Sequence, residues 1–175
     1  MTATHLFNGM PPLHHRDPGP VAACLAAAFG GDLVVELVAD GVHLAPATVR
    51  TVLRVTGGNA VLVTDAMAAA GMPDGDYRLG SMAVRVAGGV ARLATSDGSP
   101  GPIAGGTAHL IDVVRTTVAS GVSLLDAVRA ASTVPASVLG LTDIGALAAG
   151  YRADVLVTDA DLHPRRVLRA GVPVD

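Results

Sequence analysis

The sequence predicts an α/β fold organised around a small parallel sheet, and three features of the chain indicate this. The first 70 residues alternate between short apolar runs of strand length and longer runs with helical spacing. The apolar run that ends at Asp65 follows a glycine pair and has no polar alternation, which is typical of a strand buried on both faces. The last part of the chain holds short strand-like runs without helices between them. Because strand–helix–strand units place their strands in parallel, we expect a parallel sheet followed by a β appendage.

The elements of the first part follow from the positions of proline and glycine. A β-like run at the N-terminus ends at Asn8-Gly9, a pair that favours a turn. Pro20 and Pro46 suit the first turn of a helix, and a pair of glycines follows each helical run and suits its end. In chain order we expect a strand over 2–7, a helix over 21–29, a strand over 33–38, a helix over 45–55 and the strand that ends at Asp65.

The second part begins with turn-forming residues and ends with short strands. In chain order we expect a loop over 72–80, a hairpin of 82–86 and 90–94, a helix from Thr107 to about Ser120, a helix capped by Ser123, a short helix from Pro135 to Gly140, a strand within 150–159 and a last hairpin of 167–170 and 172–174. We therefore divide the chain into 1–140, with a hairpin insertion near 77–95, and 141–175, the β appendage.

The composition argues against several classes of protein. The net charge is −3 and there is no basic stripe or aromatic platform, so nucleic acid is not an expected partner. No uncharged apolar run of 18 residues could span a membrane, and the N-terminus does not resemble a signal peptide. One cysteine, Cys24, cannot form an intrachain disulfide, which fits a cytoplasmic protein. All twelve basic residues are arginines, so no lysine is available for Schiff-base chemistry.

Polar side chains follow each of the three expected parallel strands. His5 and Asn8 follow the first strand, His43 follows the second and Asp65 follows the third. Because the carboxyl ends of parallel strands meet at one edge, we expect these side chains to lie on the same rim. Imidazole and carboxylate groups on one rim can bind a metal or move protons. Alternatively, Asp65 only caps the next segment and the histidines are structural.

These motifs, in this order, resemble those of the N-acetylglucosamine-6-phosphate deacetylases of the amidohydrolase superfamily. The joint pattern is specific and covers the whole chain, whereas a single piece of it is weak. The matching stretches are Thr4–Pro11, His15–Gly19, Ala39–His43, Leu62–Met72, Ile103–Thr107 and Gly150–Asp154.

The resemblance implies a partial (β/α)8 barrel of the TIM type, of which this chain holds the last three strands, and part of a small β-sandwich over 141–175. It also implies a role for individual residues. By resemblance, His5 is a ligand of a divalent metal of the Zn or Fe type and Asp65 is the general acid and base. The resemblance also implies that the sugar phosphate is bound by Asn8, Gly9, Arg16 and His43. It further implies that the sugar pocket is lined by Ile103, Ala104 and Gly105. In the family Arg16 and His43 would reach the neighbouring subunit's site, which implies a functional homodimer.

The implied reaction is hydrolysis of the acetamide of N-acetylglucosamine 6-phosphate to glucosamine 6-phosphate and acetate. A metal would activate water, and Asp65 would move the proton from that water to the leaving amine. A complete barrel needs roughly 250 residues, and the resemblance places the other metal ligands, a glutamate and a histidine, outside this chain. We therefore expect the chain by itself to be truncated and inactive.

Two other functions remain open at the level of sequence. The chain could belong to an amidohydrolase that acts on another amide, such as a cyclic one. It could also be a non-catalytic fragment or a subunit that needs a separate N-terminal half. Arg16→Ala distinguishes an enzyme for another amide from one for a phosphorylated sugar. The substitution should raise KM strongly for a phosphorylated sugar and little for an uncharged amide.

Overall fold

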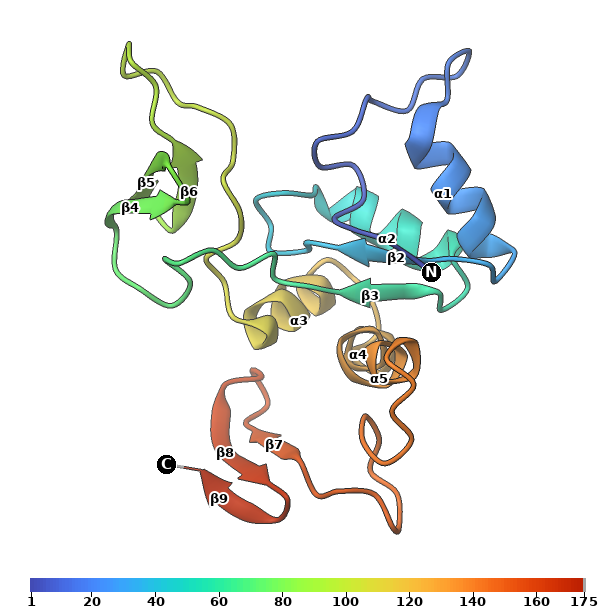
Figure 1. Cartoon of the computed structure of the whole chain (residues 1–175). Helices are drawn as coiled ribbons and strands as arrows, with labels where there is room; N and C mark the ends of the chain where they lie inside the picture. Colours follow the sequence, from blue (N-terminus) through green and yellow to red (C-terminus); the bar gives the residue numbers. More distant parts are fainter. Residues whose placement is uncertain (175) are drawn as a thin grey trace.

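A computed structural model describes residues 1–174 of the chain. Within this part the chain forms three separate three-stranded sheets, and helices pack around the first of them. Figure 1 shows the first sheet in the middle of the molecule, with the second sheet at the upper left and the third sheet below. The arrangement is a mixed α/β fold, which agrees with the fold class that the sequence predicts.

The first sheet is parallel and its strands follow one another in space as in sequence. It consists of β1 (Thr2–Ala3), β2 (Val34–Leu37) and β3 (Ala60–Leu62) in the order β1-β2-β3. Helix α1 (Gly19–Phe29) joins the first two strands and α2 (Pro46–Val55) joins the second pair. The predicted strand–helix alternation is thus confirmed, with the expected proline in the first turn of both helices.

The first strand is much shorter than the sequence predicts. Residues 2–7 have a β-like pattern, but β1 ends at Ala3 and the chain turns at once. The turn carries positive φ values of 32° at His5 and 77° at Phe7, which lie outside the β region. The apolar alternation misled the prediction because Leu6 is fully buried from within a turn rather than from a strand.

The main core lies between one face of this sheet and the helices. Val35, Leu37 and Leu62 from the strands pack with Val49 and Val52 of α2, and all five side chains are buried. Small β-branched and aliphatic residues give this core little apolar area per residue, so its stability depends on close packing.

Two helical segments complete the first layer. Helix α3 (Leu110–Ala119) packs against α2 and β3, and α4 (Leu124–Val128), a π-helical turn η1 (Arg129–Thr133) and α5 (Val134–Val138) form one continuous stretch. Ser123 caps α4 as predicted, since its Oγ accepts a hydrogen bond from the Asp126 amide at 3.1 Å. Helix α3 begins at Leu110 rather than at Thr107: His109 is its N-cap residue, and the Asp112 carboxylate accepts a hydrogen bond from the His109 amide at 3.1 Å.

The second sheet is antiparallel and has its own small core. It comprises β4 (Gly75–Leu79), β5 (Met82–Ala87) and β6 (Val90–Leu93) in that order. The hairpin of β5 and β6 is confirmed, but β4 replaces part of the predicted 72–80 loop. Tyr77 of β4 lies opposite Val84 of β5 and packs against the buried cluster of this sheet.

The third sheet lies at the C-terminal end and is poorly covered. It consists of β7 (Val155–Thr158), β8 (Pro164–Arg169) and β9 (Val172–Val174), all antiparallel. None of the described residues from 137 onward is buried. None of the described helices is long and apolar enough to cross a membrane.

Candidate active site

The parallel pairing of β1, β2 and β3 brings the ends of the three strands to one edge of the sheet. The loops that leave this edge contain His5 and Asn8, then His43, then Asp65. In Figure 1 the arrows of β2 and β3 point the same way, toward the loops that lead to the second sheet. The topology therefore gives the predicted residues a common rim.

His5 lies in the tight turn that follows β1 and is half-buried. The buried side chain of Leu6 and the hydrogen bond from its amide to the Glu36 carbonyl, at 2.8 Å, hold this turn against β2. A φ of 32° is unusual for histidine, and such a conformation persists only where surrounding contacts impose it. The Nδ1 atom of His5 is buried and has no hydrogen-bond partner among the described residues. A buried imidazole nitrogen without a hydrogen-bond partner fits a metal ligand.

Asn8 and Gly9 shape the same turn. The Asn8 side-chain amide donates to the carbonyl of His5 at 3.2 Å and, more weakly, to that of Leu6 at 3.4 Å. Gly9 has a φ of 68°, which suits glycine. Asn8 thus uses its amide donor within the turn, and its visible role is to support His5.

Arg16 lies in an exposed loop, away from this turn in sequence and in contacts. Its side chain makes no hydrogen bond or ion pair within residues 1–174. Among the described residues, no hydrogen bond or ion pair joins the Arg16 side chain to His5, His43 or Asp65.

His43 is held by a residue that the sequence analysis did not select, Asp40. The His43 Nδ1 and Asp40 Oδ2 atoms are 2.8 Å apart, and the two side chains are only 5% and 6% exposed. Asp40 Oδ1 also accepts hydrogen bonds from the amides of Val42 and His43, both at 2.9 Å. Burial by itself raises the pKa of Asp40, but the hydrogen bonds from His43 and Val42 outweigh it and hold the pKa below its ordinary value. The Asp-Gly-Val-His spacing, an Asx turn that ends on a histidine, could have identified Asp40.

Asp65 lies in a strained turn directly after β3. Its φ is 49°, its carbonyl accepts a hydrogen bond from the Gly106 amide at 2.7 Å, and the next residue but one, Met67, donates to the Gly106 carbonyl at 3.1 Å. The Asp65 side chain is exposed and makes no hydrogen bond within the described part of the chain. The next element along the chain is β4, and the Asp65 side chain accepts no hydrogen bond from the described residues that follow it, so Asp65 does not cap the next segment.

Gly105 and Gly106 allow the close contact that positions Asp65. A Cβ at Gly106 would lie 1.9 Å from the Thr64 carbonyl oxygen, and one at Gly105 would lie 3.0 Å from that of Asp65. In the structure the group that these two glycines approach closely is the backbone that follows β3. Ala104 is buried in the core of the second sheet, and Ile103 forms an isolated bridge with Arg92. The contacts of residues 103–105 therefore join the second sheet to the Asp65 turn.

A divalent metal is not accommodated by this chain alone. No group of three or more histidine, cysteine or acidic side chains that could hold a metal occurs in residues 1–174. Three protein ligands are usual for a catalytic metal such as zinc. His5 fits as one ligand, and the rest of a ligand set is not present in the described structure.

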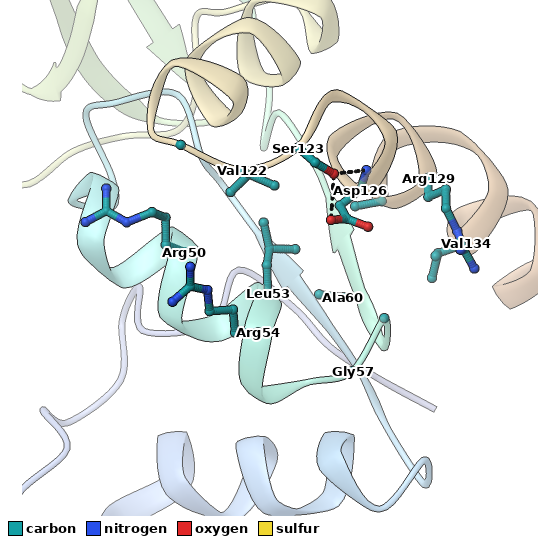
Figure 2. A pocket seen from close by; sticks show the side chains of 13 residues that line it. Arg50, Leu53, Arg54, Gly57, Ala60, Val122, Ser123, Asp126, Arg129 and Val134 are labelled. Atoms are coloured by element: carbon teal, nitrogen blue, oxygen red, sulfur yellow. Dashed lines mark hydrogen bonds between the residues drawn. The ribbon is translucent and has the colours of Figure 1, made fainter.

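Two cavities of the described structure lie away from these residues. A cavity of about 370 Å³ opens between the end of α2, the start of β3 and α4, and Figure 2 shows Arg50 and Arg54 on one side of it and Arg129 on the other. Ala60 in its wall is the first residue of β3, whereas Asp65 follows the last. A second cavity, of about 450 Å³, lies along β5 and β6. Neither includes His5, His43 or Asp65.

Comparison with known proteins gives matches over nearly the whole chain. Residues 10–173 match the Amidohydrolase family. A protein of Escherichia coli K12 that is provisionally named an N-acetylgalactosamine-6-phosphate deacetylase is 41% identical over 169 residues, covering 95% of this chain and 96% of the relative. The N-acetylgalactosamine-6-phosphate deacetylase of Escherichia coli O157:H7 is also 41% identical, but the match covers 43% of its length.

A solved structure shares the fold closely. It is that of an Asp→Ala mutant of the N-acetyl-D-glucosamine-6-phosphate deacetylase from Mycobacterium smegmatis, in complex with N-acetyl-D-glucosamine-6-phosphate. The TM-score is 0.88 at 45% identity, and the match covers 98% of this chain and 45% of that one. The chain therefore spans less than half of this relative and of the O157:H7 protein, and almost all of the K12 protein.

Proposed function

Because this chain belongs to the amidohydrolase family, we propose that it serves the hydrolysis of the acetamide of N-acetylglucosamine 6-phosphate to glucosamine 6-phosphate and acetate. The observation that carries the proposal is the Asp65 turn: an exposed carboxylate at the end of a parallel strand, held at a φ of 49° by two glycines. Strain of this kind, at a strand end where α/β enzymes place catalytic groups, supports a role in chemistry.

In the proposed reaction Asp65 is the group that moves the proton. Its carboxylate takes a proton from the attacking water and delivers it to the nitrogen of the leaving amine, so that the C–N bond breaks to acetate and amine. Asp65 suits this task because its side chain is free of hydrogen bonds within the described residues and open to a substrate.

The three parallel strands are, in this proposal, the last three of a (β/α)8 barrel, and β7–β9 are part of a small β-sandwich. The share of the longer relatives that the chain covers, 43% and 45%, supports this. His5 is then one ligand of a divalent metal whose remaining ligands lie on the part of the fold that this chain does not contain. The half-buried thiol of Cys24 and the absence of a second cysteine are in keeping with a cytoplasmic enzyme.

We assign phosphate binding to Arg16, His43 and the turn of Asn8 and Gly9. Arg16 lies on an exposed loop and can extend toward a neighbouring subunit, which supports a homodimer. His43 differs from it, because its side chain is 95% enclosed by its own chain and is bound to Asp40. By the family resemblance both Arg16 and His43 would reach the neighbouring subunit's site.

A second substrate is favoured by a specific observation. Two of the relatives at 41% identity carry the name of an N-acetylgalactosamine-6-phosphate deacetylase. The two sugars differ in the configuration of one hydroxyl, so both substrates belong in every assay. A cyclic amide and a non-catalytic subunit remain the alternatives outside this class.

The test joins this chain to the N-terminal part of the Mycobacterium smegmatis deacetylase, in place of the segment that the chain matches. Acetate release from both phosphorylated sugars is measured with added divalent metal. We expect turnover, and we expect Asp65→Asn to lower kcat by about 100-fold or more, because general acid–base catalysis contributes on that scale. Asparagine tolerates the positive φ at this position, so the melting temperature should not change.

The matched control is Asp161→Asn, which changes an exposed aspartate near the third sheet whose carboxylate has no hydrogen bond among the described residues. It should leave kcat unchanged. A folded joined protein that hydrolyses neither sugar, or an Asp65→Asn variant with full turnover, would show that the proposed function is wrong.

A further inference from the structure

The pair formed by Asp40 and His43 is the most completely buried ion pair that the described residues contain, and it lies on the same rim as Asp65. A buried carboxylate needs donors for its oxygen atoms, because burial without them is costly. Here every donor comes from residues 42 and 43: two backbone amides reach Oδ1 and the imidazole reaches Oδ2.

This geometry determines where the hydrogen of His43 lies. The pKa of Asp40 is held below its ordinary value, so the carboxylate is ionised in the neutral range and can only accept hydrogen bonds. The Nδ1 atom of His43 must then be the donor in the 2.8 Å contact. The nitrogen that remains for a ligand is Nε2.

The consequence for an anionic ligand follows from charge. A neutral ring with its hydrogen on Nδ1 presents a lone pair at Nε2, which repels a phosphate oxygen. A ring with hydrogen on both nitrogens donates from Nδ1 to Asp40 and from Nε2 to the phosphate. The positive ring then lies between two negative groups, the Asp40 carboxylate and the phosphate. Such charge-assisted hydrogen bonds are stronger than neutral ones.

We propose that Asp40 is a positioning residue that holds His43 with its Nε2 atom presented as a cationic donor to the phosphate of the substrate. The inference rests on the proposed function, because it names a further residue of the same site. Asp40 does not touch the substrate and acts through His43 alone. The pair therefore serves recognition of the 6-phosphate and takes no part in the proton transfer at Asp65.

The kinetic test uses the joined enzyme described above, with Asp40→Asn, His43→Gln and the double variant. The side-chain oxygen of asparagine still accepts hydrogen bonds from the two backbone amides, but its NH2 group then faces Nδ1 of His43. Nδ1 has to accept from this group, so the ring hydrogen moves to Nε2 and the ring stays neutral. We expect Asp40→Asn to raise KM for the phosphorylated sugar about tenfold, the lower end of what such supporting residues are worth, with kcat within about twofold. For unphosphorylated N-acetylglucosamine neither kinetic constant should change.

The double variant separates positioning from general support of the fold. If Asp40 acts only through His43, then Asp40→Asn has no further effect once His43→Gln is present. A merely structural role predicts lower kcat for both substrates, or effects of the two substitutions that multiply. Either of these results would overturn the proposal.

A spectroscopic test uses the wild-type chain, so its outcome does not depend on whether a variant folds. Nitrogen chemical shifts of the histidine rings report the tautomer, and we expect His43 to carry its hydrogen on Nδ1 and to respond to titration with inorganic phosphate. A wild-type ring with hydrogen on Nε2 only, or one indifferent to phosphate, contradicts the assignment. Should the joined enzyme deacetylate nothing, the proposed function fails, whereas the ring measurements still decide the role of Asp40.

Discussion

Single residues at the rim are held in conformations that their own chemistry does not favour. His5, Phe7 and Asp65 have positive φ values although none of them is glycine. Each such residue costs of order 1 kcal/mol or more, which the surrounding packing has to offset. Two of the three are the residues to which we assign metal binding and proton transfer, so the strain coincides with the proposed chemistry.

The close contact of Gly106 with the Thr64 backbone can be tested by substitution. Gly106→Ser places a Cβ 1.9 Å from the Thr64 carbonyl oxygen, which is backbone and cannot step aside cheaply. We expect the substitution to lower the free energy of unfolding by about 2 kcal/mol, the usual cost of overpacking, and to lower turnover by displacing Asp65.

The control for this change is Gly75→Ala in β4. A Cβ there would meet only the Tyr77 ring at 3.7 Å, an ordinary contact, and the backbone is not in the left-handed region. Urea unfolding of the two variants measures the difference. Equal stabilities would mean that the contact between the 103–107 segment and β3 is not as close as described.

Elements are held together by a few polar contacts in addition to apolar packing. The Arg50 side chain of α2 donates from Nη1 to the Ser120 carbonyl at the end of α3, at 2.6 Å. This bond satisfies one of the carbonyls that a helix end leaves open, and it places a positive charge near the negative end of the helix.

Arg50→Ala should therefore lower the free energy of unfolding by about 1 to 2 kcal/mol, since hydrogen bonds to charged groups are worth more than neutral ones. Arg54→Ala is the matched control, one turn later on the same helix, because Arg54 is exposed and makes no side-chain hydrogen bond in the described structure. Thermal unfolding of both variants makes the comparison, and a loss of equal size at Arg54 would contradict the assignment.

The three sheets differ in how well their faces are covered. The buried residues of β2 and β3 belong to the main core, those of β5 and β6 to a smaller one, and β7–β9 contribute none. Apolar side chains of the third sheet remain open to water, among them Val172 at 65% and Val174 at 51% exposure.

Hydrogen exchange of the purified chain should follow the same order, with amides of β2 and β3 exchanging most slowly and those of β7–β9 most rapidly. Exchange measured by mass spectrometry on peptides from each sheet tests this. Protection of β7–β9 equal to that of β2 and β3 would mean that the third sheet has a partner that the described contacts do not include.

At the scale of the whole molecule, residues 1–174 do not form a complete metal site. The described residues offer His5 but no group of three ligands, so a metal that needs three has no stable place. We expect the purified chain to release no acetate from either sugar phosphate and to retain less than one zinc per chain after dialysis. Joined to the N-terminal part of the Mycobacterium smegmatis relative, it should gain both properties, and stoichiometric metal on the isolated chain would refute the expectation.

The amino-acid sequence was enough to predict the element types of the first sheet, the Ser123 cap and the family. These depend on local rules, such as proline in a first turn, glycine after a helix and the spacing of apolar residues, or on motifs that survive in order. It also selected His5, His43 and Asp65, because each follows a run of strand-like residues.

The positions of these residues and the contacts that hold them became known from the tertiary structure. The early end of β1, the strand at 75–79, the cap at His109 and the partnership of Asp40 with His43 all depend on atoms that are distant in sequence or on side-chain directions within a turn. The contact of Gly106 with Thr64 is the clearest case, because two segments 42 positions apart meet without room for a single carbon atom. Local patterns describe what a segment prefers, whereas packing between segments selects which preference is realised.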